Sequence, residues 1–172
     1  MKKILNQSLV YLLAAVVIAV DQYTKYLVRL NLALEERWAP WPWLAPYVRL
    51  LHIENTGAAF GLFQSGGLIF TVIAMVVSAV IGYYAFRLPE GQWSLRLILG
   101  LMLGGAAGNL IDRLTRGPVT DFISVGNFAI FNVADASISV GVALLAVMML
   151  LESRQKKPME TAPTDVTEAS GT

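Results

Sequence analysis

The chain has no cysteine among its 172 residues, a single histidine, and few charges, since Asp, Glu, Lys and Arg make up 15% of it. An ordinary soluble domain carries about a quarter charged residues. The lack of cysteine excludes disulfides, thiol nucleophiles, thiolate metal sites and a lipid-modified cysteine of the chain's own. The single histidine, His52, excludes a histidine-rich metal site. A formal net charge of +1 argues against a basic nucleic-acid-binding domain.

Long apolar runs take the place of the missing charges, and hydrophobic residues make up 56% of the chain. A helix needs about 20 mostly apolar residues to cross a bilayer, and its backbone must satisfy its own hydrogen bonds there. The runs that meet this requirement are residues 5–27, 66–86, 93–111 and 131–151. They predict an all-α integral membrane protein with four transmembrane helices in a domain over residues 1–157. The Thr-, Pro- and Glu-rich residues 158–172 are predicted to form a disordered cytoplasmic tail.

The basic residues predict the orientation of these helices, because Lys and Arg are enriched in cytoplasmic loops. They precede the first run, flank the short loop between the second and third, and follow the fourth: Lys2, Lys3, Arg87, Arg96, Arg154, Lys156 and Lys157. In a four-span chain these places lie on one side, so we expect both termini in the cytoplasm. A cleavable signal peptide is a weaker interpretation of the first run, which continues into Asp21 and Lys25 without a small-x-small cleavage site.

The segment over residues 28–65 then lies on the outer side of the membrane. It contains Trp38, Trp41 and Trp43 among prolines that break any long helix. Such rings settle in the headgroup layer, so simple anchoring explains them. Residues 47–53 alternate loosely and are predicted to form short strands. We therefore expect a small extracytoplasmic segment that is partly β-like and partly amphipathic.

The third run contains four glycines that form two overlapping G-x-x-x-G patterns: Gly100, Gly104, Gly105 and Gly108. Small residues at this spacing let helices approach closely in lipid. We expect tight packing within the helix bundle, with dimerisation as the alternative.

Placing polar and ionisable side chains in or beside a membrane span costs free energy, so such residues indicate a functional or structural role. Asp21 and Lys25 lie i, i+4 at the outer end of the first run, where they could form an ion pair. Alternatively, Lys25 could extend its ammonium group to the interface. Asn109, Asp112 and Arg113 share one helix face at the outer end of the third run.

Two further aspartates follow at the same end. Asp121 comes after Gly117-Pro118, which breaks the third helix. Asn132 and Asp135 lie i, i+3 where the fourth run begins. A single aspartate there could cap a helix, but capping needs only one carboxylate, and four gather at this end: Asp21, Asp112, Asp121 and Asp135.

Carboxylates that share a site cannot all ionise cheaply, so one pKa rises and a pair holds one proton. The charged member can then take a proton from water while the protonated member donates one to a substrate carbonyl. This chemistry needs no metal, thiol, histidine or cofactor. The residues alone indicate an aspartyl hydrolase at the outer membrane surface. A proton- or ion-coupled carrier and a structural subunit with buried polar contacts stay open as alternatives.

Five short motifs, in this order, resemble the lipoprotein signal peptidases, also called signal peptidase II, of the bacterial inner membrane. They are residues 21–25 (DQYTK), 55–60 (NTGAAF), 108–113 (GNLIDR), 119–122 (VTDF) and 131–135 (FNVAD). The resemblance implies an aspartic endopeptidase with four transmembrane helices. Such an enzyme removes the signal peptide from prolipoproteins by cleaving before the diacylglyceryl-modified cysteine.

Carried over by position, the resemblance implies Asp121 and Asp135 as the catalytic pair. The other polar motif residues are then expected to shape the site and bind substrate: Asp21, Asn55, Asn109, Asp112, Arg113 and Asn132. The resemblance implies diacylglyceryl-modified prolipoproteins and membrane lipid as partners and globomycin as an inhibitor, with no cofactor, metal or nucleic acid. The active site is expected near the periplasmic surface, where the Trp-rich segment could close over it as a lid.

One stretch departs from the family pattern. Residues 122–134, between the two aspartates, are fewer than is common in the family and lack a proline or tryptophan just before Phe131-Asn132. Gly126 and Asn127 can form a tight turn. We therefore expect a trimmed loop that leaves the motifs in place and alters any substrate contacts made by the loop.

Overall fold

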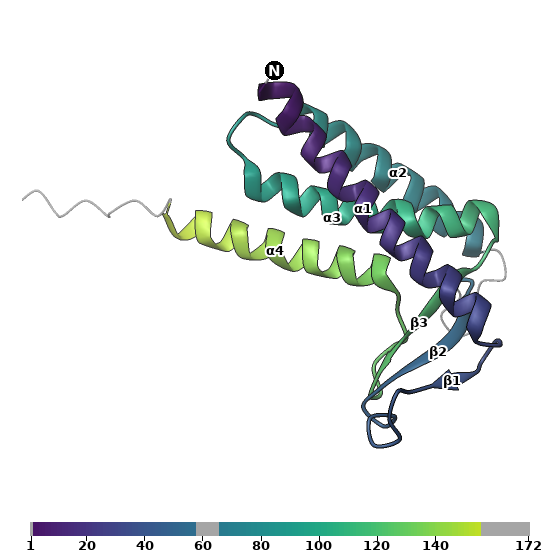
Figure 1. The fold of residues 1–172 in the computed structure, drawn as a ribbon. Helices are drawn as coiled ribbons and strands as arrows, with labels where there is room; N and C mark the ends of the chain where they lie inside the picture. Colours follow the sequence, from purple (N-terminus) through teal and green to yellow (C-terminus); the bar gives the residue numbers. More distant parts are fainter. Residues whose placement is uncertain (1, 58–65, 156–172) are drawn as a thin grey trace, which may run out of the picture.

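A computed structural model describes residues 2–57 and 66–155, so the predicted tail over 158–172 lies outside the described residues. The helices are α1 (Lys2–Asn31), α2 (Gly66–Arg87), α3 (Trp93–Thr115) and α4 (Val133–Gln155). In the described part of the chain, all four contain a span long and apolar enough to cross a membrane (Figure 1). The prediction of a four-helix membrane protein is confirmed. The helices α1, α3 and α4 run four residues past the predicted ends of their runs.

Helix α3 is the centre of the bundle and packs against each of the other three helices. Half of its most apolar stretch is buried (50%), whereas the corresponding stretches of α2 and α4 are 6% and 11% buried. One apolar cluster joins Val10 of α1, Ile81 and Ala85 of α2, and Leu99 of α3. Most side chains of α2 and α4 therefore face outward, which suits contact with lipid.

The glycines of α3 bring its neighbours close. An added Cβ at Gly104 would lie 2.6 Å from Cβ of Val17, on α1. An added Cβ at Gly105 would collide with the backbone carbonyl of Ala134, on α4. These contacts confirm the predicted packing role inside the bundle, because a larger residue at either position would push the helices apart.

A small antiparallel sheet extends from one end of the helices (Figure 1). Its strands are β1 (Arg37–Trp38), β2 (Val48–Asn55) and β3 (Val119–Val125), in the order β1-β2-β3. The predicted strand over residues 47–53 is confirmed as β2, whereas β3 was not predicted. The register pairs Ile53 with Asp121 and Asn55 with Val119, so β2 carries Asn55 to the same end of the sheet as Asp121.

The stretch between Asp121 and Asp135 folds back on β3. Gly126 adopts a positive φ of 52°, and the Phe128 amide donates to the Val125 carbonyl at 2.9 Å. Phe131 then bridges to Ile123 on β3. The predicted tight turn is confirmed, and it returns the chain at once to the start of α4.

The tryptophan-rich loop lies at the other end of the β2–β3 pair. Trp41 and Trp43 stack with ring centroids 6.0 Å apart, and both are exposed. The loop ends at Tyr47, whose carbonyl accepts a hydrogen bond from the Gly126 amide at 2.7 Å. These rings therefore do not lie over Asp121, and their exposure favours anchoring in the headgroup layer over the predicted lid.

Candidate active site

Asp121 lies on β3 with 3% of its surface exposed. Its Oδ2 accepts a hydrogen bond from Nδ2 of Asn55 at 2.8 Å, and its Oδ1 accepts one from Nδ2 of Asn132 at 2.7 Å. Burial raises the pKa of Asp121 to about 6, and the negative charge of Asp135 acts in the same direction. The two amide donors oppose this rise, because they favour the charged carboxylate.

Asp135 lies in the first turn of α4. Its Oδ1 accepts a hydrogen bond from Nδ2 of Asn109 at 2.7 Å, and its Oδ2 accepts one from the Asn132 amide at 3.2 Å. The Asp135 amide donates in return to Oδ1 of Asn132 at 2.9 Å. This reciprocal pair has the form of a capping box, in which residues three apart satisfy each other's free amides. Asp135 therefore helps cap α4 as well as meeting Asn109.

Asn132 is the residue that brings the two aspartates together. It is fully buried, and it bonds Asp121 through its side chain and Asp135 through its backbone. The sequence could not tell which two of the four aspartates meet. The structure joins Asp121 and Asp135 through Asn132, and it gives Asp21 and Asp112 a different partner.

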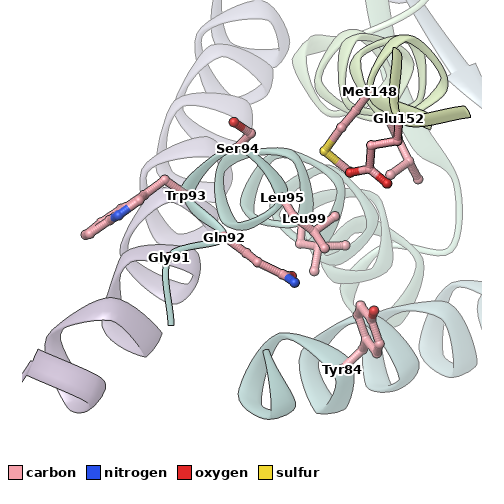
Figure 2. A pocket seen from close by; sticks show the side chains of 10 residues that line it. Tyr84, Gly91, Gln92, Trp93, Ser94, Leu95, Leu99, Met148 and Glu152 are labelled. Carbon is pink, nitrogen blue, oxygen red and sulfur yellow. The ribbon is translucent and has the colours of Figure 1, made fainter. Parts of the chain in front are cut away.

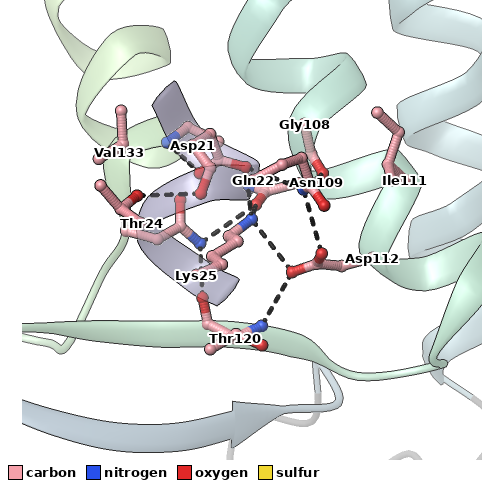
Figure 3. A network of polar contacts seen from close by, with 12 residues as sticks. Asp21, Gln22, Thr24, Lys25, Gly108, Asn109, Ile111, Asp112, Thr120 and Val133 are labelled. Atoms are coloured by element: carbon pink, nitrogen blue, oxygen red, sulfur yellow. Dashed lines mark hydrogen bonds and ion pairs between the residues drawn. The ribbon is translucent and has the colours of Figure 1, made fainter. Parts of the chain in front are cut away.

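That partner is Lys25, which is fully buried with its ammonium group inside the bundle. Nζ of Lys25 lies 2.8 Å from Oδ2 of Asp21 and 3.1 Å from Oδ2 of Asp112. It also donates to Oδ1 of Asn109 at 2.9 Å (Figure 3). The three donors of a lysine ammonium thus meet three acceptors. The predicted Asp21–Lys25 ion pair is confirmed, and the alternative in which Lys25 reaches the interface is wrong.

Asp21 and Asp112 also accept hydrogen bonds that join separate elements of the fold. Oδ1 of Asp21 accepts from the Ala134 amide at the start of α4 at 2.9 Å. Oδ2 of Asp112 accepts from the Thr120 amide on β3 at 3.1 Å, and its Oδ1 accepts from Nε2 of Gln22 at 3.1 Å. These two carboxylates therefore position β3 and α4, the elements that carry Asp121 and Asp135.

Asn109 links the two groups of residues. Its Oδ1 accepts from Lys25, which turns the Nδ2 of the same amide toward Asp135. The side chain of Asn132 also donates to Oδ1 of Asn109 at 3.1 Å. Two donors at Oδ1 of Asn109 thus fix the orientation of this side-chain amide, whose Nδ2 reaches Asp135.

Arg113 stands apart from this network. Its Nη1 donates to the Asn109 carbonyl at a long 3.4 Å, and its guanidinium lies 6.0 Å from the ring centre of Phe70 on α2. Its side chain is half-buried. Arg113 thus lies where α2 and α3 meet the polar cluster. The part of the chain that the structure describes contains no group of three or more potential metal-ligating side chains.

All eight site residues predicted from the sequence lie at this end of the molecule, and seven of them belong to one hydrogen-bonded network. The network also contains residues outside the predicted set: Lys25 as its central cation, Gln22 and Thr120 as donors to Asp112, and Arg29, whose Nη1 donates to Oγ1 of Thr120 at 2.9 Å. The i, i+4 spacing of Asp21 and Lys25 was the signal for the first. Gln22 is part of the first motif and Thr120 part of the fourth, but nothing in their spacing pointed to Asp112.

The chain matches the family model described as signal peptidase (SPase) II over residues 13–151. It is 44% identical over 153 residues to a protein named lipoprotein signal peptidase from Bacillus subtilis, covering 87% of this chain and 97% of that protein. It is 41% identical over 148 residues to the protein of that name from Shouchella clausii, covering 86% of this chain and 96% of the relative.

A solved structure described as a bacterial membrane enzyme has a similar fold. It superimposes with a TM-score of 0.77 and 28% sequence identity, covering 89% of this chain and 94% of the other. A second structure of that description gives a TM-score of 0.75 at 28% identity, with 82% and 92% coverage. Both agreements extend over nearly the whole described chain. The sequence matches and the shared fold together establish that this chain belongs to the signal peptidase II family, whose members are membrane peptidases.

Proposed function

We propose that this peptidase removes the signal peptide from prolipoproteins by cleaving just before the diacylglyceryl-modified cysteine, with Asp121 and Asp135 as its catalytic pair. The observation that carries the proposal is the meeting of these two carboxylates at Asn132. Each accepts at least one hydrogen bond from a buried asparagine, at the end of the bundle where the sheet begins. The names of the relatives support the choice of substrate.

The pair acts as a general base and a general acid. Because the pKa of Asp121 is raised to about 6, this carboxyl group can exchange a proton near neutral pH. General acid–base catalysis is most efficient when the pKa of the catalytic group lies near the working pH. One carboxylate takes a proton from the attacking water while the other donates to the carbonyl oxygen of the scissile peptide. The tetrahedral intermediate then collapses, and the proton taken from water passes to the leaving amine of the modified cysteine.

The remaining site residues position this pair. Asn55 and Asn132 hold the two oxygens of Asp121, and Asn109 holds Asp135. Asp21 and Asp112 fix the start of α4 and β3 through Ala134 and Thr120, as described above. Arg113 lies beside Phe70 of α2, and we assign it a contact with the substrate.

We place the active site near the periplasmic surface of the bacterial inner membrane, with residues 1–157 as the peptidase domain and both termini in the cytoplasm. The basic residues at the two ends of the chain and in the loop between α2 and α3 support this orientation. The substrate's acyl chains then lie in lipid beside the helices. The exposed tryptophans of residues 38–43 anchor the sheet in the headgroup layer.

The test is a gel-shift assay with the purified chain and a lipid-modified prolipoprotein. We expect a single product whose first residue is the modified cysteine, as read by mass spectrometry. The same precursor without its diacylglyceryl group should be left intact, and globomycin should block cleavage. Cleavage at another bond, or equal cleavage of the unmodified precursor, would contradict the proposed substrate.

A further inference from the structure

Two cavities outside the aspartate network differ in the charge of the residues that line them. One of about 720 Å³ lies between α2, α3 and α4 at the end of the helices away from the aspartates, and its single charged lining residue is Glu152 (Figure 2). The other, of about 320 Å³, is lined by residues of β1, β2 and the loop between them: Arg37, Trp38, Ala39, Ala45, Pro46 and Arg49. None of these six residues is acidic. This second cavity, the arginine pocket, therefore carries positive charge only.

The sheet places the two arginines of the pocket next to each other. Arg37 on β1 pairs with Leu51 on β2, and Arg49 precedes Leu51 by two residues. Alternate residues of a strand point to the same face of a sheet, and paired residues share a face, so both arginines lie on one face. Diagonal neighbours of this kind are about 7–8 Å apart. Because a guanidinium presents paired N–H groups that match phosphate oxygens, two of them at this separation can contact a single phosphate.

No carboxylate neutralises either arginine. In the part of the chain that the structure describes, neither side chain forms an ion pair, and only Arg49 forms a hydrogen bond, from Nη1 to the Ala45 carbonyl at 3.2 Å. Nε of Arg49 is buried without a partner. The acid next to Arg37 in the sequence, Glu36, accepts a hydrogen bond from the Ala33 amide at its Oε2, at 2.7 Å. Two neighbouring cations repel each other, and a bound anion would relieve that repulsion.

The aromatic rings around the pocket place it at the depth of lipid headgroups. Trp38 lines the pocket, and the loop that begins at Ala39 carries the stacked rings of Trp41 and Trp43. All three tryptophans are exposed. Exposed indole rings settle at the headgroup level of a bilayer, which is also where the phosphates of phospholipids lie. The anion at hand for this pocket in a membrane is therefore a phospholipid phosphate.

We propose that the arginine pocket binds the headgroup phosphate of an anionic phospholipid and so holds the sheet at the membrane surface. Clusters of basic residues at a membrane surface attract anionic lipids. A zwitterionic headgroup would bring a further cation to a pocket that already contains two and has no acidic lining residue. The diacylglyceryl group of the proposed substrate contains no phosphate, so this site is separate from the one that holds the substrate's lipid. The inference does not depend on the proposed cleavage reaction.

The experiment measures lipid binding to the full-length, delipidated protein in a neutral detergent by native mass spectrometry. The ligands are didecanoyl-phosphatidylglycerol, phosphatidylcholine with the same chains, didecanoylglycerol, which lacks the phosphate, and inorganic phosphate. The proteins are the wild type, Arg37→Gln, Arg49→Gln and the double variant. Arg154→Gln is the matched control, because it removes the same charge from an exposed arginine at the end of α4, outside the pocket.

The wild type should bind phosphatidylglycerol more tightly than each of the other three ligands. Each single change in the pocket should raise the Kd for phosphatidylglycerol about fivefold, the contribution of one basic residue near an anionic membrane surface, and the double variant should raise it about 25-fold. Arg154→Gln should bind as the wild type does. All variants should unfold within about 2 °C of the wild type, because none of these arginines takes part in an ion pair among the described residues.

A double variant that keeps the wild-type affinity for phosphatidylglycerol would overturn the inference. A loss in Arg154→Gln equal to that in Arg37→Gln would also overturn it, because net charge rather than the pocket would then attract the lipid. Equal affinity for phosphatidylcholine, didecanoylglycerol or inorganic phosphate would exclude an anionic phospholipid as the specific ligand, in favour of any phospholipid, of the acyl chains or of a free anion. None of these measurements involves cleavage, so the proposed function is tested separately.

Discussion

Lys25 is the cation on which the arrangement of the site depends, so Lys25→Met is the most informative single change. The methionine is unbranched and only one atom shorter than the lysine side chain, and it removes the charge. Asp21 and Asp112 would then face each other as buried carboxylates without the ammonium that lies 2.8 and 3.1 Å from them. Asn109 would also lose the donor that orients its amide toward Asp135.

The size of the effect follows from the burial of all three charged groups, each of which is 0% exposed. Removing one partner of a buried ion pair costs about 3–5 kcal/mol. For a chain of this size a loss of 1 kcal/mol lowers the unfolding temperature by roughly 2–4 °C. We therefore expect Lys25→Met to unfold about 6–20 °C below the wild type.

The assay is thermal unfolding of the purified protein in detergent, followed by tryptophan fluorescence. Tyr26→Phe is the control: its ring is 53% exposed, so it should unfold within about 2 °C of the wild type. Asp112→Asn should lower the unfolding temperature of the wild type. In the Lys25→Met background it should raise the unfolding temperature partway back, because it removes a carboxylate that has lost its ion-pair partner. A Lys25→Met protein that unfolds within 2 °C of the wild type would refute the reasoning, as would an equal loss from Asp112→Asn in both backgrounds.

Three further predictions concern packing, proton transfer and metal dependence. Gly105→Ala should destabilise the protein by about 1–3 kcal/mol or more, because the backbone carbonyl of Ala134 cannot move away from the added Cβ. Gly82→Ala is the control and should not destabilise the protein, because an added Cβ there meets nothing within 4 Å. Equal unfolding temperatures for the two variants would contradict this prediction. Asn55→Ala removes a donor that lowers the pKa of Asp121, so the limb of the pH–rate profile near pH 6 should move to higher pH, and an unmoved limb would count against the assignment. Treatment with a metal chelator should leave the cleavage rate unchanged, and strong inhibition would argue for a metal mechanism.

The helices and the motif residues could be predicted from the sequence, because each depends on local pattern. Four apolar runs suffice to place α1 to α4, and the break at Gly117-Pro118 ends α3 as expected. The i, i+4 spacing also indicated the Asp21–Lys25 pair. These features need no knowledge of how distant segments meet.

The division of the aspartates into two groups depends on contacts between distant segments and could not be predicted. Asp112 joins Lys25 because α1 crosses α3 closely, which the glycines of α3 allow. Asp121 reaches Asn132 because β3 folds back through the turn at Gly126. β3 itself could not be predicted, because Val119–Val125 (VTDFISV) does not alternate regularly between apolar and polar residues. The sequence also does not reveal that the tryptophans lie at the end of the sheet away from Asp121, so it leaves a lid-like role open for them.

The most direct test of the central claim is the cleavage rate of Asp121→Asn, Asp135→Asn and the double variant with a lipid-modified prolipoprotein. If the two carboxylates act as one unit, each single change should lower kcat by about 10³-fold or more, and the double variant should lose little beyond that. All three proteins should insert into membranes normally. A single variant that keeps a rate within tenfold of the wild type, or losses that multiply in the double variant, would contradict a shared catalytic role for Asp121 and Asp135.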